Sequence, residues 1–307
     1  MNNTKPTDAF AQTRPQRIVD PLARFERSER RRKRSRRGLG CAVVVLALAL
    51  ILGIYFLFPG RTNILVLGID RSTVSTNINL SRSDTMMLVT VVPLTPHVGL
   101  LSIPRDLWID IPGGGQNRIN TVHFFAEANQ PGSGPAAAAR VVASLFNVPV
   151  NYTVRLRFDG VREIVNALGG VELDLPTAMG GLAAGKHFLN GDQALTFVRD
   201  RKGTDDFFRT NQQRVFVEAV TRRLRNPITW IRLPLVLAAI SRSVDTNIPV
   251  WQWPRLAAAL VRAGPKGIDA QGITREMTQG FITDSGADVL LPLWDAINPL
   301  VDKMFRK

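Results

Sequence analysis

Residues 63–106 read NILVLGIDRSTVSTNINLSRSDTMMLVTVVPLTPHVGLLSIPRD, and this stretch decides the fold. It holds three short β-branched runs bounded by turn residues: Asn63 to Gly68, Thr85 to Val92 and His97 to Ile103. Charged residues stand at the ends of these runs, namely Asp70, Arg82, Asp84, Arg105 and Asp106. Any one of them could be an ordinary loop residue. Together they predict a buried sheet that brings ionic groups to one rim, where open α/β sheets bind their ligands.

Strands and helices alternate after this stretch. A run of good helix formers covers 136–146, and a strand over 151–158 is expected to turn Arg155 and Arg157 to solvent. Asp159 is a candidate N-cap for a helix that glycines close at 169–170, and another strand follows at 171–175. The order predicts an α/β fold, a three-layer α/β/α sandwich with a central mixed sheet.

The charge of the chain is concentrated at its start. Residues 1–38 contain twelve Lys or Arg and four Asp or Glu, which is about +8 of the total of +14. We expect a disordered basic tail there. Its run RSERRRKRSRR, residues 27–37, could bind nucleic acid, but it directly precedes an uncharged apolar segment. That position favours a role in membrane orientation, and no nucleic-acid partner is expected.

The apolar segment, residues 39–58, is long enough to cross a bilayer. Because positive charge flanks it on the N-terminal side, the tail is expected in the cytoplasm and residues 59–307 outside the cell membrane. A cleaved signal peptide would have a shorter apolar region and a small-x-small site, which this segment lacks. The linker at 59–62 reaches only about 15 Å, so the extracytoplasmic domain should lie against the outer leaflet and favour a membrane-embedded substrate. The single cysteine, Cys41, allows no internal disulfide.

A second charged cluster covers residues 190–224. Asn190 or Asp192 can cap a short helix ending near Arg199, and a longer helix follows with Arg209 and Gln213 at the start of its apolar stripe. Polar groups on a buried stripe need partners. An ion pair with Asp205 or Asp206 and an anionic ligand at the helix N-terminus are both open.

Three later segments have simpler expectations. Residues 230–240 are too short for a second span and predict a core or membrane-facing helix. Residues 277–282 predict a weak strand, and 288–305 a helical pattern interrupted by two prolines. The glycines at 113–115 lack the Lys and Ser or Thr of a P-loop and indicate a turn.

The chemistry that the chain offers is ionic. Its three histidines form no i, i+4 pair and no G-x-S-x-G motif is present, so a zinc hydrolase or a covalent serine enzyme has little support. Arginines bind phosphate oxygens in a bidentate manner, and aspartates hold Mg²⁺ that bridges to phosphate. This combination fits phosphoryl transfer.

Seven ordered segments then carry a resemblance: LGIDR, SRSDTMMLVTV, LLSIPRD, NRIN, LGGVELDLP, LNGDQALTFVRDRK and DFFRTNQQR. They closely resemble the LytR-CpsA-Psr family of bacterial cell-wall proteins. The resemblance implies a phosphotransferase that moves a glycopolymer from a polyprenyl-pyrophosphate carrier to the muramic-acid 6-hydroxyl of peptidoglycan, with its polyprenyl tail between the sheet and its helices. The apolar segment at 39–58 adds the lipid bilayer as a further expected partner.

The resemblance also implies the site. Asp70 and Asp84 would hold Mg²⁺, and Asp84 either helps to deprotonate the acceptor or serves only as a metal ligand. The pyrophosphate would be bound by Arg82, Arg105, Arg118, Arg199, Arg201, Arg209 and Gln213, and the residues expected to be catalytic are Asp84, Arg105, Arg201 and Arg209. Phe208 and Gln212 depart from the family pattern, which has Gly and Arg there, and Gln212 is left out of the expected site.

Two other functions stay open. The same grip on pyrophosphate could serve a polyprenyl-pyrophosphate hydrolase that passes the phosphate to water. The chain could instead be a non-catalytic lipid-binding or regulatory protein of the cell envelope.

Overall fold

The structure is a computed structural model that describes residues 42–56, 60–69, 83–200 and 206–306, without the side chains of 206–209. The chain divides into two compact units, Met1–Ile54 and Tyr55–Lys307. In the first unit, residues 42–54 are helical and their apolar side chains are almost all exposed. Within these described ranges, no helix has the length and apolar character needed to span a membrane.

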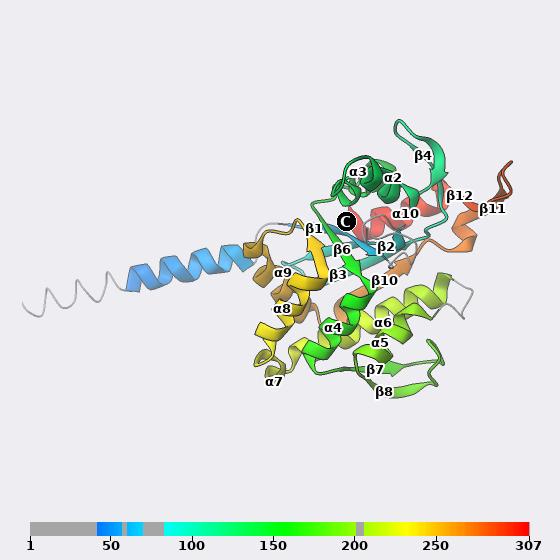
Figure 1. The fold of residues 1–307 in the computed structure, drawn as a ribbon. Helices are drawn as coiled ribbons and strands as arrows, with labels where there is room; N and C mark the ends of the chain where they lie inside the picture. Colours follow the sequence, from blue (N-terminus) through cyan, green and yellow to red (C-terminus); the bar gives the residue numbers. More distant parts are fainter. Residues whose placement is uncertain (1–41, 57–59, 70–82, 201–205, 307) are drawn as a thin grey trace, which may run out of the picture. The chain divides into compact units, whose positions relative to one another are not determined.

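The second unit alternates strands and helices (Figure 1). Its strands are β1 Thr62–Ile69, β2 Ser83–Val92, β3 His97–Ile103, β4 Trp108–Ile111, β5 Gly115–Arg118, β6 Tyr152–Arg157, β7 Val171–Leu175, β8 Gly185–Leu189, β9 Val244–Thr246, β10 Ile268–Gly272, β11 Thr278–Ile282 and β12 Asp288–Pro292. Its helices are α2 Thr121–Asn129, α3 Gly134–Phe146, α4 Phe158–Leu168, α5 Gly191–Arg199, α6 Asp206–Arg225, α7 Pro227–Trp230, α8 Leu233–Ser243, α9 Trp253–Ala263 and α10 Trp294–Phe305, with short 3₁₀ turns η1 Val250–Gln252, η2 Pro265–Gly267 and η3 Arg275–Met277. The three strands and the helices expected from the sequence between 63 and 175 are confirmed.

Six strands form a central mixed sheet in the order β10-β3-β2-β1-β6-β9. Strand β2 is antiparallel to β1 and β3, whereas β6 runs parallel to β1 and β10 runs parallel to β3. As a result, the ends of β1, β3, β6 and β10 and the start of β2 meet at one rim. The register shows this directly, because Ile69 pairs with both Ser83 and Arg157, and Gly272 pairs with Ser102.

Helices pack on both faces of this sheet because its strands are apolar on both sides. On one face, Leu65, Leu88 and Leu101 lie in a core that includes residues of α3 and α10. On the other face, Val89 and Leu100 pack with Val217 of α6 and Leu260 of α9. Helices α4, α5, α6 and α8 form a further core with β7, a strand that pairs only with β8 outside the central sheet. The fold is thus a mixed α/β fold with a central mixed sheet.

Local signals placed most helix ends correctly. Gly169 ends α4 in the left-handed region with φ of 78°, a conformation that glycine adopts without steric cost. Asn190 caps α5 by a capping box in which its side chain accepts from the Gln193 backbone N–H, and Gln193 returns the bond. The helix that follows β6 starts earlier than expected, so Asp159 lies in its first turn and Arg157 occupies the N-cap.

The expectation that Arg155 faces solvent is wrong. Its side chain is only 7% exposed, because its guanidinium lies 3.2 Å from Glu127 Oε1 and also binds Asp245 of the edge strand region. Glu127 in turn accepts from the backbone N–H groups of Gly132 and Gly134 at 2.8 and 2.9 Å. A buried ion pair satisfied in this way lets a charged residue occupy a core position. The β6 face that carries Arg155 is therefore covered, not solvated.

The end of the chain is a second correction. Residues 288–292, expected to begin a helical pattern, form strand β12 paired with β11, and the helix begins only at Trp294. Pro299 lies inside α10, so only the proline at 292 marks a boundary.

Candidate functional site

A continuous chain of ion pairs lies at the rim of the sheet. Arg105 Nη1 donates to Asp84 Oδ1 at 2.8 Å, and Arg105 Nε lies 3.4 Å from Asp106 Oδ2. The other Asp106 oxygen lies 3.3 Å from Arg118 Nε. We call Asp84, Arg105, Asp106 and Arg118 the rim cluster. Their side chains are 23–35% exposed, so the cluster is open to a ligand from solvent.

Three separate elements deliver these residues. Asp84 is the second residue of β2, and Arg105 and Asp106 follow the end of β3. Arg118 ends β5 of the small β4–β5 ribbon. The antiparallel pairing of β2 with β3 places the start of one strand beside the end of the other, which explains why residues twenty-one positions apart meet.

Backbone hydrogen bonds hold the loop after β3. The carbonyl of Arg105 accepts from the Asn120 N–H at 3.3 Å, and the carbonyl of Asp106 accepts from the Leu290 N–H at 3.1 Å. Arg118 Nη2 donates to the carbonyl of Asp288 at 2.7 Å. Strand β12 and the start of α2 therefore fix the loop, and the cluster is pre-oriented before any ligand arrives.

The electrostatics of Arg105 keep it charged. Burial lowers the pKa of its guanidinium, but the neighbouring carboxylates of Asp106 and Asp84 raise it by more, so its pKa lies above the ordinary value. Arginine is already charged at every physiological pH. Arg105 is therefore a permanent cation at this rim.

The second charged cluster expected from the sequence reaches the same rim from the other side. Arg199, the last residue of α5, lies with its Cζ 5.3 Å from the ring centre of Phe158, in the range of a cation–π contact. Phe158 directly follows β6, whose end pairs with the end of β1. Arg199 is therefore placed at the β6 side of the rim.

Helix α6 starts at the opposite edge. Thr210 packs so closely on Gly272, the last residue of β10, that a Cβ on this glycine would lie 2.3 Å from Thr210 Oγ1. The first turns of α6, which carry Arg209 and the half-buried Gln213, are thus held at the end of β10. Gln212, left out of the expected site, is buried and donates to the carbonyl of Phe197 in α5. It ties the two helices together, a positioning role that the motif alone did not reveal.

The structure brings together three of the expected site residues, Asp84, Arg105 and Arg118, and puts Arg199 and Gln213 on elements that reach the same rim. Asp70, Arg82 and Arg201 lie outside the described residues, as does the side chain of Arg209. Asp106 was missed as a site residue although it follows Arg105 in the sequence. Its bridging position depends on β5, which no local signal connects to β3.

A metal would find oxygen ligands of the right kind at this rim. Within the part of the chain that the structure describes, no three His, Cys, Asp or Glu side chains group into a metal site. Mg²⁺ is commonly bound by one or two carboxylates together with substrate phosphates, so the Asp84 carboxylate fits that chemistry without a full protein cage.

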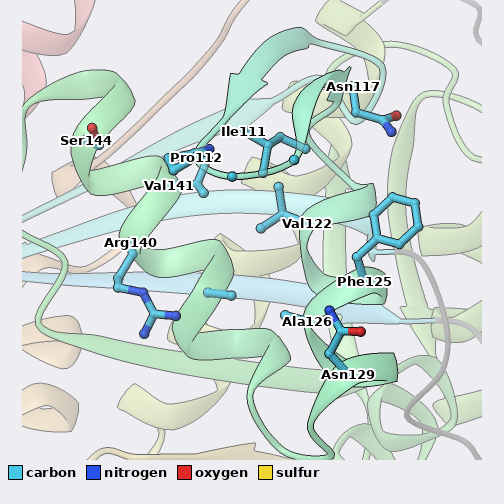
Figure 2. A pocket seen from close by; sticks show the side chains of 13 residues that line it. Ile111, Pro112, Asn117, Val122, Phe125, Ala126, Asn129, Arg140, Val141 and Ser144 are labelled. Carbon is cyan, nitrogen blue, oxygen red and sulfur yellow. The ribbon is translucent and has the colours of Figure 1, made fainter.

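A hollow of about 690 Å³ opens between the β4–β5 ribbon and helices α2 and α3. Figure 2 shows its apolar wall, with Ile111, Val122 and Val141, and its polar border, with Asn117, Asn129 and Arg140. The exposed ring of Phe125 stands at its edge, and none of the thirteen lining residues is acidic. Asn117, which lines the hollow, directly precedes Arg118 of the rim cluster in β5.

Comparison with known proteins gives the relationships of the chain. Residues 58–292 match the model of the LytR_cpsA_psr family. A polyisoprenyl-teichoic acid–peptidoglycan teichoic acid transferase TagU of Oceanobacillus iheyensis is 32% identical over 192 residues, which is 61% of this chain and 58% of the relative. TagU of Bacillus cereus, with the same description, is 34% identical over 193 residues, 61% of this chain and 60% of the relative. The aligned part thus spans about 60% of the length of these curated relatives.

Solved structures show the same fold. The crystal structure of B. subtilis TagV has a TM-score of 0.63 and 23% identity, and the match covers 80% of this chain and 97% of that one.

Proposed function

Because this chain belongs to the LytR_cpsA_psr family, we propose that it is a phosphotransferase that moves a glycopolymer from a polyprenyl-pyrophosphate carrier to the muramic-acid 6-hydroxyl of peptidoglycan. The names of its curated relatives support the donor and acceptor classes. The observation that carries the proposal is the rim cluster, in which carboxylates hold two arginines at one edge of the central sheet, where several strands end.

In this proposal the arginines bind the pyrophosphate. Arg105 and Arg118 present forked donors that match phosphate oxygens, and Arg199 adds charge from the other side of the rim. The family motifs imply that the pyrophosphate-binding site is completed by Arg82, Arg201, Arg209 and Gln213. Fixed cations of this kind stabilise the charge of a phosphoryl-transfer transition state without reorganising.

The reaction is a displacement at phosphorus. The acceptor hydroxyl oxygen bonds to the phosphorus on the sugar side of the donor, and the bond from that phosphorus to the bridging oxygen breaks. The bridging oxygen leaves with its electron pair as part of polyprenyl phosphate. Asp84 is the candidate to accept the hydroxyl proton, and its alternative role is as a metal ligand only.

Mg²⁺ is the proposed cofactor. Asp84, with Asp70, would hold it, and a bound Mg²⁺ would supply charge neutralisation to the phosphate oxygens.

We propose that sugar units of one glycan substrate occupy the hollow beside Arg118. A sugar ring has an apolar face and a border of hydroxyl groups. The apolar wall and the amides of Asn117 and Asn129 match that arrangement.

Membrane anchoring is proposed for residues 39–58, with the tail in the cytoplasm and residues 59–307 outside the membrane. The uncharged composition of this segment and the arginines before it support the proposal. So does the helical, exposed apolar stretch over 42–54.

The full chain in lipid nanodiscs, supplied with a polyprenyl-pyrophosphate glycan, peptidoglycan fragments and Mg²⁺, tests the function. Mass spectrometry should show a phosphodiester-linked adduct that Arg105→Ala lowers by about a hundredfold, the usual effect of removing one transition-state donor. Arg162→Ala, which removes a half-exposed arginine on α4 with only a 3.8 Å ion pair, should leave the adduct unchanged.

Two outcomes would contradict the proposal. Full transfer by Arg105→Ala would remove the rim cluster from the mechanism. Release of the glycan phosphate to water without an adduct, with acceptor present, would make the protein a pyrophosphate hydrolase.

A further inference from the structure

Large apolar side chains are exposed on α7, α8 and η1. Ile231 is 83% exposed, Val250 81% and Ile228 73%, far beyond what a buried helix face shows. We call the following eight side chains the docking surface: Ile228, Trp230, Ile231, Leu233, Leu235, Leu237, Val250 and Trp251. Soluble monomers rarely leave apolar side chains gathered in this way unless something binds them.

We propose that the docking surface lies on the headgroup region of an anionic phospholipid bilayer and holds the catalytic domain flat against it. Figure 1 shows α7, α8 and α9 along the same side of the domain. The proposal goes beyond the transfer reaction, since it assigns a lipid contact to a surface remote in sequence from the rim cluster.

The charge of this region selects the partner. Residues 219–268 contain seven arginines, one lysine and a single acidic residue, Asp245, whose carboxylate pairs with Arg155. Arg225, Arg232 and Arg242 are exposed beside the apolar residues. Apolar side chains bordered by cations are the pattern of helices that bind anionic membrane surfaces.

The two tryptophans suit the interface between lipid and water. Trp230 is 55% exposed while its Nε1–H donates to the carbonyl of Leu224 at 2.9 Å, so its ring is held outward with its polar group already bonded. Trp251 is 61% exposed. Tryptophan is enriched at membrane–water interfaces because its ring is amphipathic.

Tyr55, Gly60 and Arg61 contact η1, α9 and α10 through hydrogen bonds. The Tyr55 hydroxyl donates to the carbonyl of Trp251, and Arg255 Nη2 donates to the carbonyl of Gly60 at 3.2 Å. Arg61 Nη1 donates to the carbonyl of Met304 at 2.5 Å.

Fluorescence quenching tests the contact without using the enzyme reaction. The full chain is placed in nanodiscs of phosphatidylglycerol and phosphatidylcholine, with bromine atoms near the headgroup end of the acyl chains, and tryptophan emission is recorded. We expect Trp230→Phe and Trp251→Phe each to lower the quenched fraction of the emission, because each removes a lipid-facing emitter. The matched control, Trp108→Phe in β4, should raise that fraction because it removes an emitter that faces no lipid.

A second arm tests the role of charge and of the apolar residues. Replacing phosphatidylglycerol by phosphatidylcholine should lower the quenching of the Trp251→Phe variant, in which Trp230 reports α7. In the same Trp251→Phe background, the double variant Ile231→Glu, Leu235→Glu should also lower the quenching of Trp230. Both side chains are exposed, so these substitutions should leave the fold intact.

Two results would overturn the proposal. One is a quenched fraction that Trp230→Phe and Trp251→Phe leave as in the wild type. The other is covalent crosslinking between two copies through α8 in the same nanodiscs with Trp230 unquenched, which would make the surface a protein interface. Neither tryptophan quenching nor crosslinking depends on glycan transfer, so both tests hold whether or not the proposed reaction occurs.

Discussion

Asp106, expected at the rim but given no role in the site, shows how one carboxylate can organise its neighbours. One oxygen contacts Arg105 and the other contacts Arg118, so the side chain joins the β3 loop to the β4–β5 ribbon. Single ion pairs on open surfaces contribute little, but a bridge between two pre-oriented arginines also sets their geometry.

Asp106→Ala should therefore lower transfer by about tenfold to a hundredfold, since a hydrogen bond to a charged group is worth about 1.5–3 kcal/mol. Steady-state kinetics with the donor glycan measure this. Asp110→Asn, at an exposed position of β4, is the control and should change nothing. Equal activity of the two variants would show that Asp106 does not orient the arginines.

Glu127 governs acid stability through its ion pair with Arg155. Burial raises the pKa of the Glu127 carboxyl, but the Gly132 and Gly134 N–H groups and Arg155 lower it by more, so its pKa lies below the ordinary value. Its stabilising contribution is thus complete above about pH 4.5 and is lost as the pH falls through the depressed value in the folded state.

Glu127→Gln should cost about 3 kcal/mol at pH 7, the scale for breaking a buried pair. In urea unfolding, the difference from the wild type should shrink below pH 4.5. The exposed Glu172→Gln serves as the control. A difference that stays constant down to pH 2 would mean that Glu127 does not titrate with folding.

Among the helices and strands, the close contact of Thr210 in α6 with Gly272 in β10 is the packing that a single substitution disturbs most easily. Gly272→Ala places a Cβ where Thr210 Oγ1 now lies, so the start of α6 must move away from the rim. We expect transfer to fall by about tenfold or more, since small displacements of catalytic groups are costly. Adding Thr210→Ala removes the clashing oxygen and should restore most of the activity. Failure of this rescue would show that the glycine acts in some other way.

The hollow between α2, α3 and the β4–β5 ribbon can be filled from within. Ala137→Phe directs a ring into it and should raise the KM for one glycan substrate by about tenfold, equivalent to about 1.4 kcal/mol of lost contacts. The thermal midpoint should change little because the ring enters open space. Unchanged KM values for both donor and acceptor would contradict sugar binding in the hollow.

Features set by neighbouring residues in the sequence could be predicted. Features that depend on contacts between residues far apart in the sequence could not. Short β-branched runs bounded by turn residues predicted β1 to β3, and glycine and asparagine signals predicted the end of α4 and the start of α5. The burial of Arg155 depends on Glu127 and Asp245, twenty-eight residues before it and ninety after it, which no strand pattern contains. In the site, the pairing of Asp84 with Arg105 followed from strand order, whereas the contact of Asp106 with Arg118 required the position of a separate ribbon.

On the scale of the whole molecule, the proposed anchor and the docking surface should act together. A flexible 12-residue Gly/Ser insertion between Phe58 and Pro59 would add roughly 20 Å of reach. We expect transfer from a membrane-embedded donor to fall only slightly, because the docking surface still holds the domain. Combined with Ile231→Glu and Leu235→Glu, the insertion should lower that transfer severalfold more than the two separate fold-changes multiplied together. Additive effects of the two changes would indicate that they do not cooperate.

In the proposed function, the rim cluster would also influence which anions the protein binds. Arg105 and Arg118 already carry their own counter-ions, Asp84 and Asp106, so a chloride or a single phosphate merely exchanges one partner for another and gains little. A pyrophosphate diester carries one negative charge on each of two neighbouring phosphates, so a single such ligand could replace both carboxylates. In the proposed function, the paired carboxylates would therefore favour a ligand that can engage both arginines at once.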